Sequence, residues 1–170
     1  MLLAQMRSAR KAAGLTQQQA ADRLGVSQAY LALLERGRHT LTDQLRSKIA
    51  KVYRLGPTSL PLEMDSPVTW NSALVAAALA KLGYPGFRQL RGRGRKNPAI
   101  VILAALGARD LEVRVIEALP WLLVEYGSDL DWDWLVRESK LRDLQNRLGF
   151  LVTIAREVAE KRREHGRAHV

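Results

Sequence analysis

Residues 7–37 of this 170-residue chain read RSARKAAGLTQQQAADRLGVSQAYLALLERG. Thr16, followed three residues later by Gln19, has the spacing of a capping box and predicts the start of a helix. Gly25 can adopt the positive φ that ends a helix, and after one intervening residue Ser27 can cap the next helix. Two helices joined by so short a turn must cross steeply.

The flanking sequence predicts one further helix on each side of this pair. Apolar positions that alternate with basic ones predict a short amphipathic helix over residues 3–12, ending at Gly14. A fourth helix is expected over about residues 42–54, where three apolar residues with helical spacing face inward: Leu45, Ile49 and Val52. The first 60 residues therefore predict a small all-helical domain.

Three segments of this stretch carry a family resemblance: GLTQ at residues 14–17, LGVS at 24–27 and LERG at 34–37. Their sequence and spacing are similar to those of the helix-turn-helix domain of phage repressor and Cro proteins, also called the XRE family. The resemblance covers about residues 1–60. It implies a lambda-repressor-like fold that binds double-stranded DNA, with the helix that follows Ser27 in the major groove.

The resemblance also assigns roles to single residues. It implies that the residues that contact bases are Gln28, Ala29 and Leu33. Gln28 is the best base reader because a glutamine amide can donate and accept together at adenine, whereas the apolar side chains of Ala29 and Leu33 can touch a thymine methyl. Phosphate contacts fall on Gln17, Tyr30, Arg38 and Thr40, with His39 beside them. Arg10 and Glu35 match positions that form a structural salt bridge.

Three of these residues have a second interpretation. Leu33 stands where polar residues are more usual, so it either faces the groove or packs in the core or against another domain. Gln17 either contacts phosphate or is a solvated residue of the second helix. Tyr30 either donates to phosphate or packs between helices.

The second half of the chain predicts more helices and almost no strand. We therefore expect an all-α protein in which a helical bundle or a stack of helices follows the DNA-binding domain. The proline-rich stretch at residues 56–67 places a linker at 61–67. Residues 68–164 then form a domain for dimerisation, sensing or partner binding, and residues 165–170 form a basic tail.

Local signals place several of these helices. Asn97 and Pro98 form a cap and first-turn pair for the almost wholly apolar residues 99–106, which we expect at the centre of the second domain. Asp110 is expected to cap the next helix. Pro120 is expected to kink or break that helix.

The last helical stretch carries apolar residues at spacings of seven, or of three and four in alternation, which is typical of a coiled-coil seam. The seam includes Leu141, Leu144, Leu148 and Leu151. It is either packing within the domain or a dimer interface. Gly149 interrupts the seam and Phe150 widens the apolar face, which favours packing within the domain.

A basic segment lies between two predicted helices, with five Lys or Arg residues in nine positions: Arg88, Arg91, Arg93, Arg95 and Lys96. Arg-Gly-Arg strings resemble the arms that enter the narrow A·T minor groove, although the flanking prolines of a true AT-hook are absent. The segment is therefore a possible DNA-binding arm, a solvated loop or a contact for an acidic protein.

Composition excludes several classes of protein. The net charge of +10 divides equally between residues 1–65 and 66–170, and the chain has no cysteine and only three histidines. We therefore expect no metal, no cofactor and no enzymatic activity. No apolar run approaches the length that spans a bilayer, so we expect a cytoplasmic protein with no membrane contact.

Two functions fit these patterns. The first is a sequence-specific transcriptional regulator, a homodimeric repressor on a two-fold symmetric operator. The second is the antitoxin of a toxin–antitoxin pair, whose C-terminal helices neutralise a toxin protein while the N-terminal domain represses the operon.

Overall fold

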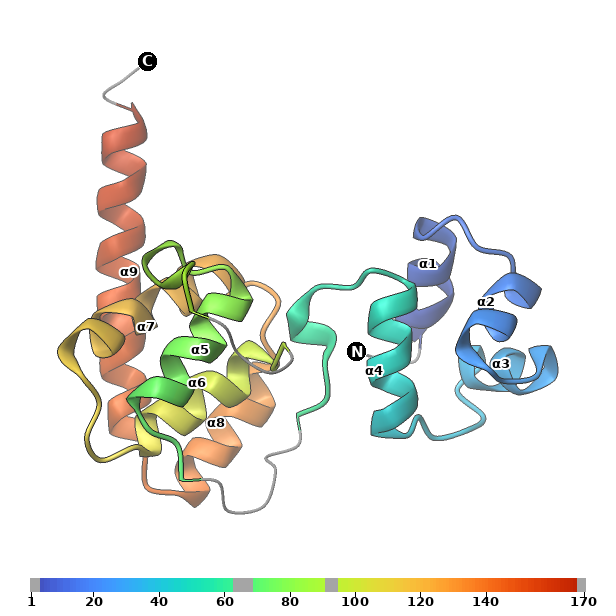
Figure 1. Ribbon diagram of the computed structural model, residues 1–170, viewed down its shortest axis with the longest axis horizontal. Helices are drawn as coiled ribbons and strands as arrows, with labels where there is room; N and C mark the ends of the chain where they lie inside the picture. Colours follow the sequence, from blue (N-terminus) through green and yellow to red (C-terminus); the bar gives the residue numbers. More distant parts are fainter. Residues whose placement is uncertain (1–3, 63–68, 91–94, 168–170) are drawn as a thin grey trace. The chain divides into compact units, whose positions relative to one another are not determined.

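The computed structural model describes residues 4–62, 69–90 and 95–167 (Figure 1). These residues form nine α-helices and two short 3-10 helices and contain no strand, which confirms the predicted all-α fold class. The chain divides into two compact units, residues 1–61 and 62–170. Most of the predicted linker, residues 63–67, and the end of the predicted tail, residues 168–170, lie outside the described residues.

The first unit consists of four α-helices and one 3-10 helix. They are α1 (Ala4–Ala12), α2 (Gln17–Leu24), α3 (Gln28–Glu35), α4 (Asp43–Val52) and η1 (Pro57–Ser59). The Oγ1 of Thr16 accepts from the backbone N–H of Gln19 at 3.2 Å, and Oε1 of Gln19 accepts from the backbone N–H of Thr16 at 3.0 Å. This is the capping box that the sequence predicts.

The turn between α2 and α3 takes three residues. Gly25 has φ 71°, a left-handed conformation that costs a glycine little. The Oγ of Ser27 accepts from the backbone N–H of Tyr30 at 3.1 Å and so caps α3. Ala20 and Ala21 are fully buried, and their small side chains let α2 approach its neighbours closely. The core around them also includes Met6, Leu24, Leu31, Leu34, Leu45 and Ile49.

The second unit is built around a central apolar helix. Its elements are α5 (Ser72–Leu82), η2 (Pro85–Phe87), α6 (Pro98–Gly107), α7 (Val113–Tyr126), α8 (Trp132–Leu141) and α9 (Gln145–Arg167). Every residue of α6 from Pro98 to Leu106 is buried, and α6 contacts α5, α7 and α8. The end of α9 extends beyond the other helices of this unit (Figure 1). Among the described helices, none combines the length and the apolar character needed to cross a membrane.

The structure corrects the predicted cap at Asp110 and narrows the expectation for Pro120. Asp110 does not cap α7, which begins three residues later; instead the carbonyl O of Asp110 accepts from Oγ of Ser72 at 3.4 Å. The same Oγ accepts from the backbone N–H of Glu112 at 2.7 Å, so α5 holds this loop. Pro120 lies inside α7 without ending it. Its ring is buried, and packing offsets the hydrogen bond that a proline cannot donate.

The structure separates the leucines of the predicted seam. Leu144, Leu148 and Leu151 are buried in the core of the second unit, so their spacing reflects packing within that unit. Leu141 is 73% exposed. The chain turns between α8 and α9, where Asp143 has φ 56°, and this turn takes Leu141 off the buried face.

We expect Leu122→Ala to destabilise the second unit by about 2–5 kcal/mol, because Leu122 is fully buried and the substitution leaves a cavity. Leu141→Ala is the matched control and should change stability by less than about 0.5 kcal/mol. All four tryptophans lie between residues 70 and 134. Urea unfolding followed by tryptophan fluorescence therefore reports on this unit. Equal losses in the two variants would contradict the assigned core.

Candidate nucleic-acid interface

A buried ion pair joins the first helix to the end of the third. Nε of Arg10 donates to Oε1 of Glu35 at 2.6 Å, and a second guanidinium nitrogen donates to Oε2 at 3.2 Å. The two side chains are only 9% and 4% exposed. The remaining guanidinium nitrogen donates to the carbonyl O of Leu15 at 2.9 Å, directly before the capping box of α2. The hydrogen bond to Glu35 raises the pKa of Arg10 above its ordinary value, against the opposing effect of burial.

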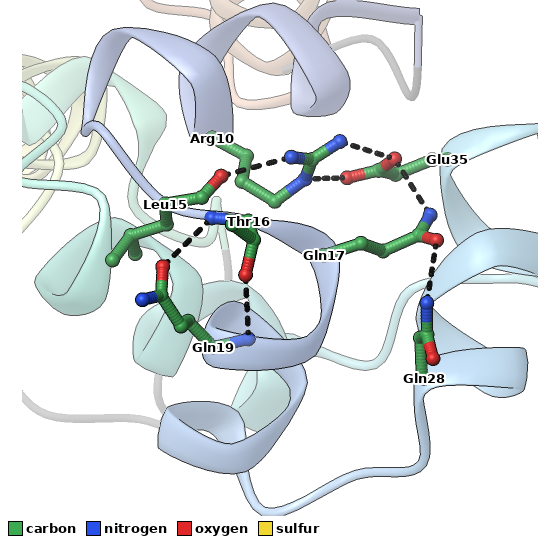
Figure 2. Close-up of polar contacts among 7 residues, drawn as sticks. All are labelled: Arg10, Leu15, Thr16, Gln17, Gln19, Gln28 and Glu35. Carbon is green, nitrogen blue, oxygen red and sulfur yellow. Dashed lines mark hydrogen bonds and ion pairs between the residues drawn. The ribbon is translucent and has the colours of Figure 1, made fainter.

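The carboxylate of Glu35 also holds Gln17, the first residue of α2. Nε2 of Gln17 donates to Oε2 of Glu35 at 3.1 Å. Because a carboxylate can only accept, the amide nitrogen of Gln17 must face Glu35, and its oxygen is left for another donor. That donor is Nε2 of Gln28, at 3.5 Å, a long hydrogen bond. Figure 2 shows this chain of contacts from Arg10 through Glu35 and Gln17 to Gln28.

The groove-facing positions of the resemblance lie together on α3. Gln28 is the first residue of α3 and is exposed, as is Ala29 one residue later. Leu33, one turn further along, is partly buried. The exposed start of α3 thus presents one amide and one methyl group, while Leu31 and Leu34 on the opposite side are fully buried.

Residues 6–60 match the family model described as Helix-turn-helix, and the rest of the chain matches no family model. Neither the curated proteins nor the solved structures include a match to the chain. Residues 6–60 form a helix-turn-helix domain of the XRE type. This confirms the resemblance and makes this part of the chain a DNA-binding domain.

The helix-turn-helix domain carries a basic segment after α3. Gly37 has φ 72°, which lets the chain turn so that the backbone N–H of Arg38 donates to the carbonyl O of Leu33 at 2.9 Å. The residues that follow are exposed: Arg38, His39 and Thr40. The ring of Tyr30 is partly buried against the core and lies 5.4 Å from the ring of His39. Tyr30 thus packs against the core and beside His39, and its phosphate contact stays a prediction.

Gln17 is the predicted phosphate contact whose surroundings differ most from the expectation. Its side chain is partly buried and bonded at both ends of the amide, so the alternative of a solvated residue does not describe it. Its backbone N–H lies in the first turn of α2, where amide groups have no partner within the helix. A phosphate contact from Gln17 therefore stays a prediction, with the backbone as its donor.

Sequence reasoning missed Tyr53, at the end of α4. Its side chain is buried, and its hydroxyl has no hydrogen-bond partner among the described residues. Burial, together with the nearby charge of Glu35, raises the pKa of Tyr53 to about 12, and the charge of Arg10 acts in the opposite direction. Tyr53 follows Leu45 and Ile49 at the same spacing of four residues. This helical periodicity indicates that Tyr53 continues the buried face of α4.

The basic segment of the second unit is only partly described. Arg91 and Arg93 lie outside the described residues, Arg88 is exposed and Lys96 is partly buried. Nε of Arg95 donates to the carbonyl O of Lys81 at 3.2 Å, at the end of α5. A cation at the C-terminal end of a helix stabilises it, so Arg95 has a structural contact independent of DNA. Within the described part of the chain, no group of three acidic or histidine side chains could hold a metal ion.

The phenol of Tyr53 should titrate near pH 12 in the folded chain, against about 10 in an unfolded chain. Between these values the unfolded state binds fewer protons, so the free energy of unfolding should fall as the pH rises through this window and be unaffected below it. Ultraviolet difference absorbance between the wild type and Tyr53→Phe measures this one phenolate. A difference curve centred near pH 10 would contradict the buried position of the hydroxyl.

Proposed function

We propose that this protein is a sequence-specific transcriptional regulator that binds a two-fold symmetric operator as a homodimer and represses transcription. The observation that carries the proposal is the position of Gln28: it is exposed at the start of α3, and its amide is bonded to a Gln17 side chain that Glu35 holds from the interior. A base-reading side chain held in one orientation loses less conformational entropy on binding.

The chemistry of Gln28 fits an adenine. The hydrogen bond to Gln17 uses one of the two amide hydrogens and leaves the second hydrogen and the carbonyl oxygen. One donor and one acceptor on the same planar group match N7 and N6 of adenine in the major groove. Ala29 and Leu33 add apolar groups that fit a thymine methyl.

Phosphate contacts supply the rest of the affinity. The exposed segment 36–40 carries two arginines, a histidine and a threonine directly after α3, and the start of α2 adds backbone donors. A domain of this size reads only a few base pairs, so two copies on two half-sites are needed for specific binding. The second unit is available for that pairing, since it exposes several large apolar side chains, among them Val113, Ile116 and Phe150.

We expect sites selected in vitro from random DNA to be inverted repeats whose half-sites lie about 10 base pairs apart, or a multiple of that. Gln28→Ala should weaken binding to these sites by about 1–3 kcal/mol and remove the base preference at one position of each half-site. Gln18→Ala, which removes an exposed amide elsewhere on α2, is the matched control and should change neither. Fluorescence anisotropy and repeated selection measure both effects. Equal losses on selected and random DNA would show that Gln28 does not read a base.

The basic segment 88–96 is proposed as a second phosphate contact. Because Arg95 already caps α5, the test replaces Arg91 and Arg93. Arg91→Ala with Arg93→Ala should reduce the slope of log affinity against log salt by about 2, which corresponds to two fewer phosphate contacts. Arg137→Ala with Arg156→Ala removes the same charge from exposed positions elsewhere and should leave the slope unchanged. An unaltered slope in the first variant would mean that the segment does not touch DNA.

The same exposed apolar side chains support a second candidate function, that of an antitoxin, because such residues also suit a protein of a different sequence. This function predicts that the product of a short neighbouring gene is toxic when expressed alone and copurifies with the full chain. Ile116→Ser with Phe150→Ser should abolish the copurification. Absence of any such gene next to this one would contradict the antitoxin function.

A further inference from the structure

The second unit has a hollow of about 470 Å³ on its surface, bounded by three separate segments. The segment before α5 contributes Trp70 and Asn71. Helix α6 contributes Leu103, the loop after it contributes Arg109, and the turn after α8 contributes Arg142 and Leu144. This volume lies in the range of small-molecule sites in proteins, which are lined mostly by apolar groups with a few polar ones.

The floor and one wall of the hollow are apolar. Leu103 and Leu144 are buried in the core of the unit, so the floor is fixed by packing. Trp70 is partly buried and packs against the same core, and its indole remains part of the lining. An indole presents a flat apolar surface on which a planar ring can stack.

Two guanidinium groups give the hollow its charge. Arg109 is exposed and makes no ion pair or hydrogen bond to any described residue. Arg142 donates to the carbonyl O of Glu138 at 3.1 Å and pairs with the carboxylate of that residue. The position of Arg142 at the end of α8 explains that contact, because a cation is favoured at a helix C-terminus. Among the described residues no contact explains Arg109, so its five donors can serve a ligand.

The net charge of the residues that line the hollow determines which kind of anion fits best. Asp110 also lines the hollow, so the three charged groups together carry one net positive charge. The Asp110 carboxylate repels a phosphate dianion more strongly than it repels a carboxylate monoanion, because the dianion carries twice the charge. A carboxylate monoanion can therefore bind the two arginines with less repulsion from Asp110. We propose that this hollow binds a small aromatic carboxylate, with the ring against Trp70 and the carboxylate between Arg109 and Arg142. This site is independent of the proposed function, since it involves no residue of the DNA-binding domain.

The test is isothermal titration calorimetry on the full chain with three probes of this class, namely indole-3-acetate, benzoate and 4-hydroxyphenylacetate. At least one should bind with a Kd below about 1 mM. Indole-3-acetamide has nearly the same shape as indole-3-acetate without its charge, so it should bind at least about tenfold more weakly than the acid.

Variants identify the site. Arg109→Ala with Arg142→Ala should weaken binding of the carboxylate by at least about tenfold, and Trp70→Ala should weaken binding of acid and amide alike. Arg137→Ala with Arg156→Ala removes the same charge outside the hollow and should leave the Kd unchanged. Circular dichroism checks that each variant is folded, and the comparison of acid with amide needs no variant. The proposal is overturned if no probe binds, if acid and amide bind equally, or if the double variant in the hollow keeps the wild-type Kd.

Discussion

The buried ion pair between Arg10 and Glu35 is the interaction on which the helix-turn-helix domain depends. It joins α1 to the last residue of α3, and the same guanidinium holds the carbonyl of Leu15 just before α2. One buried polar cluster therefore connects α1, α3 and the start of α2. Removing one partner of such a pair leaves an uncompensated buried charge, which costs about 3–5 kcal/mol, whereas an apolar pair of similar volume can be as stable. We infer that the ion pair serves to orient Gln17, and through it Gln28, more than to stabilise the domain.

The second unit is held together differently. Its centre is α6, a helix with buried apolar residues on all sides, and its described ion pairs lie at the surface. Exposed ion pairs contribute about 0–1 kcal/mol each, so hydrophobic burial dominates the stability of this unit. Local hydrogen bonds then fix its loops, as Ser72 does for the loop before α7. The surface of this unit is consequently free to carry apolar and charged groups, and the proposed contacts with a second copy and with a ligand use that surface.

Local signals in the sequence were sufficient for much of the fold. The capping box at Thr16 and the turn at Gly25 depend on residues three or fewer apart, and the structure has both. The cap at Asp110 is wrong because Ser72, distant in the sequence, binds that loop. Of the kink or break expected at Pro120, the break does not occur, since burial offsets the hydrogen bond that the proline cannot donate. Prediction from spacing also failed for one leucine of the seam. The spacing does not reveal the turn at Asp143, after which Leu141 is exposed.

The contacts of the candidate site were harder to predict from the sequence than the helices were. The contact between Arg10 and Glu35 spans 25 positions and was expected only from the family resemblance. Gln17 was expected at phosphate, and no local pattern indicates that a residue 18 positions away holds its amide. Tyr53 was missed although it shares the spacing of Leu45 and Ile49, because a tyrosine at a helix end has no fixed preference for the interior.

The most direct test of the orienting role is a double-mutant cycle with Arg10→Met, Glu35→Leu and the two together. Hydrogen exchange of the amides of residues 6–60 measures the stability of the domain, and fluorescence anisotropy on selected DNA measures its binding. Each single variant should lose about 3–5 kcal/mol of stability, and the double variant should regain most of that loss. The stable double variant should nevertheless bind its site more weakly and with less base preference, because Gln17 has lost its acceptor. A double variant that is stable and binds DNA with wild-type affinity and preference would contradict the account.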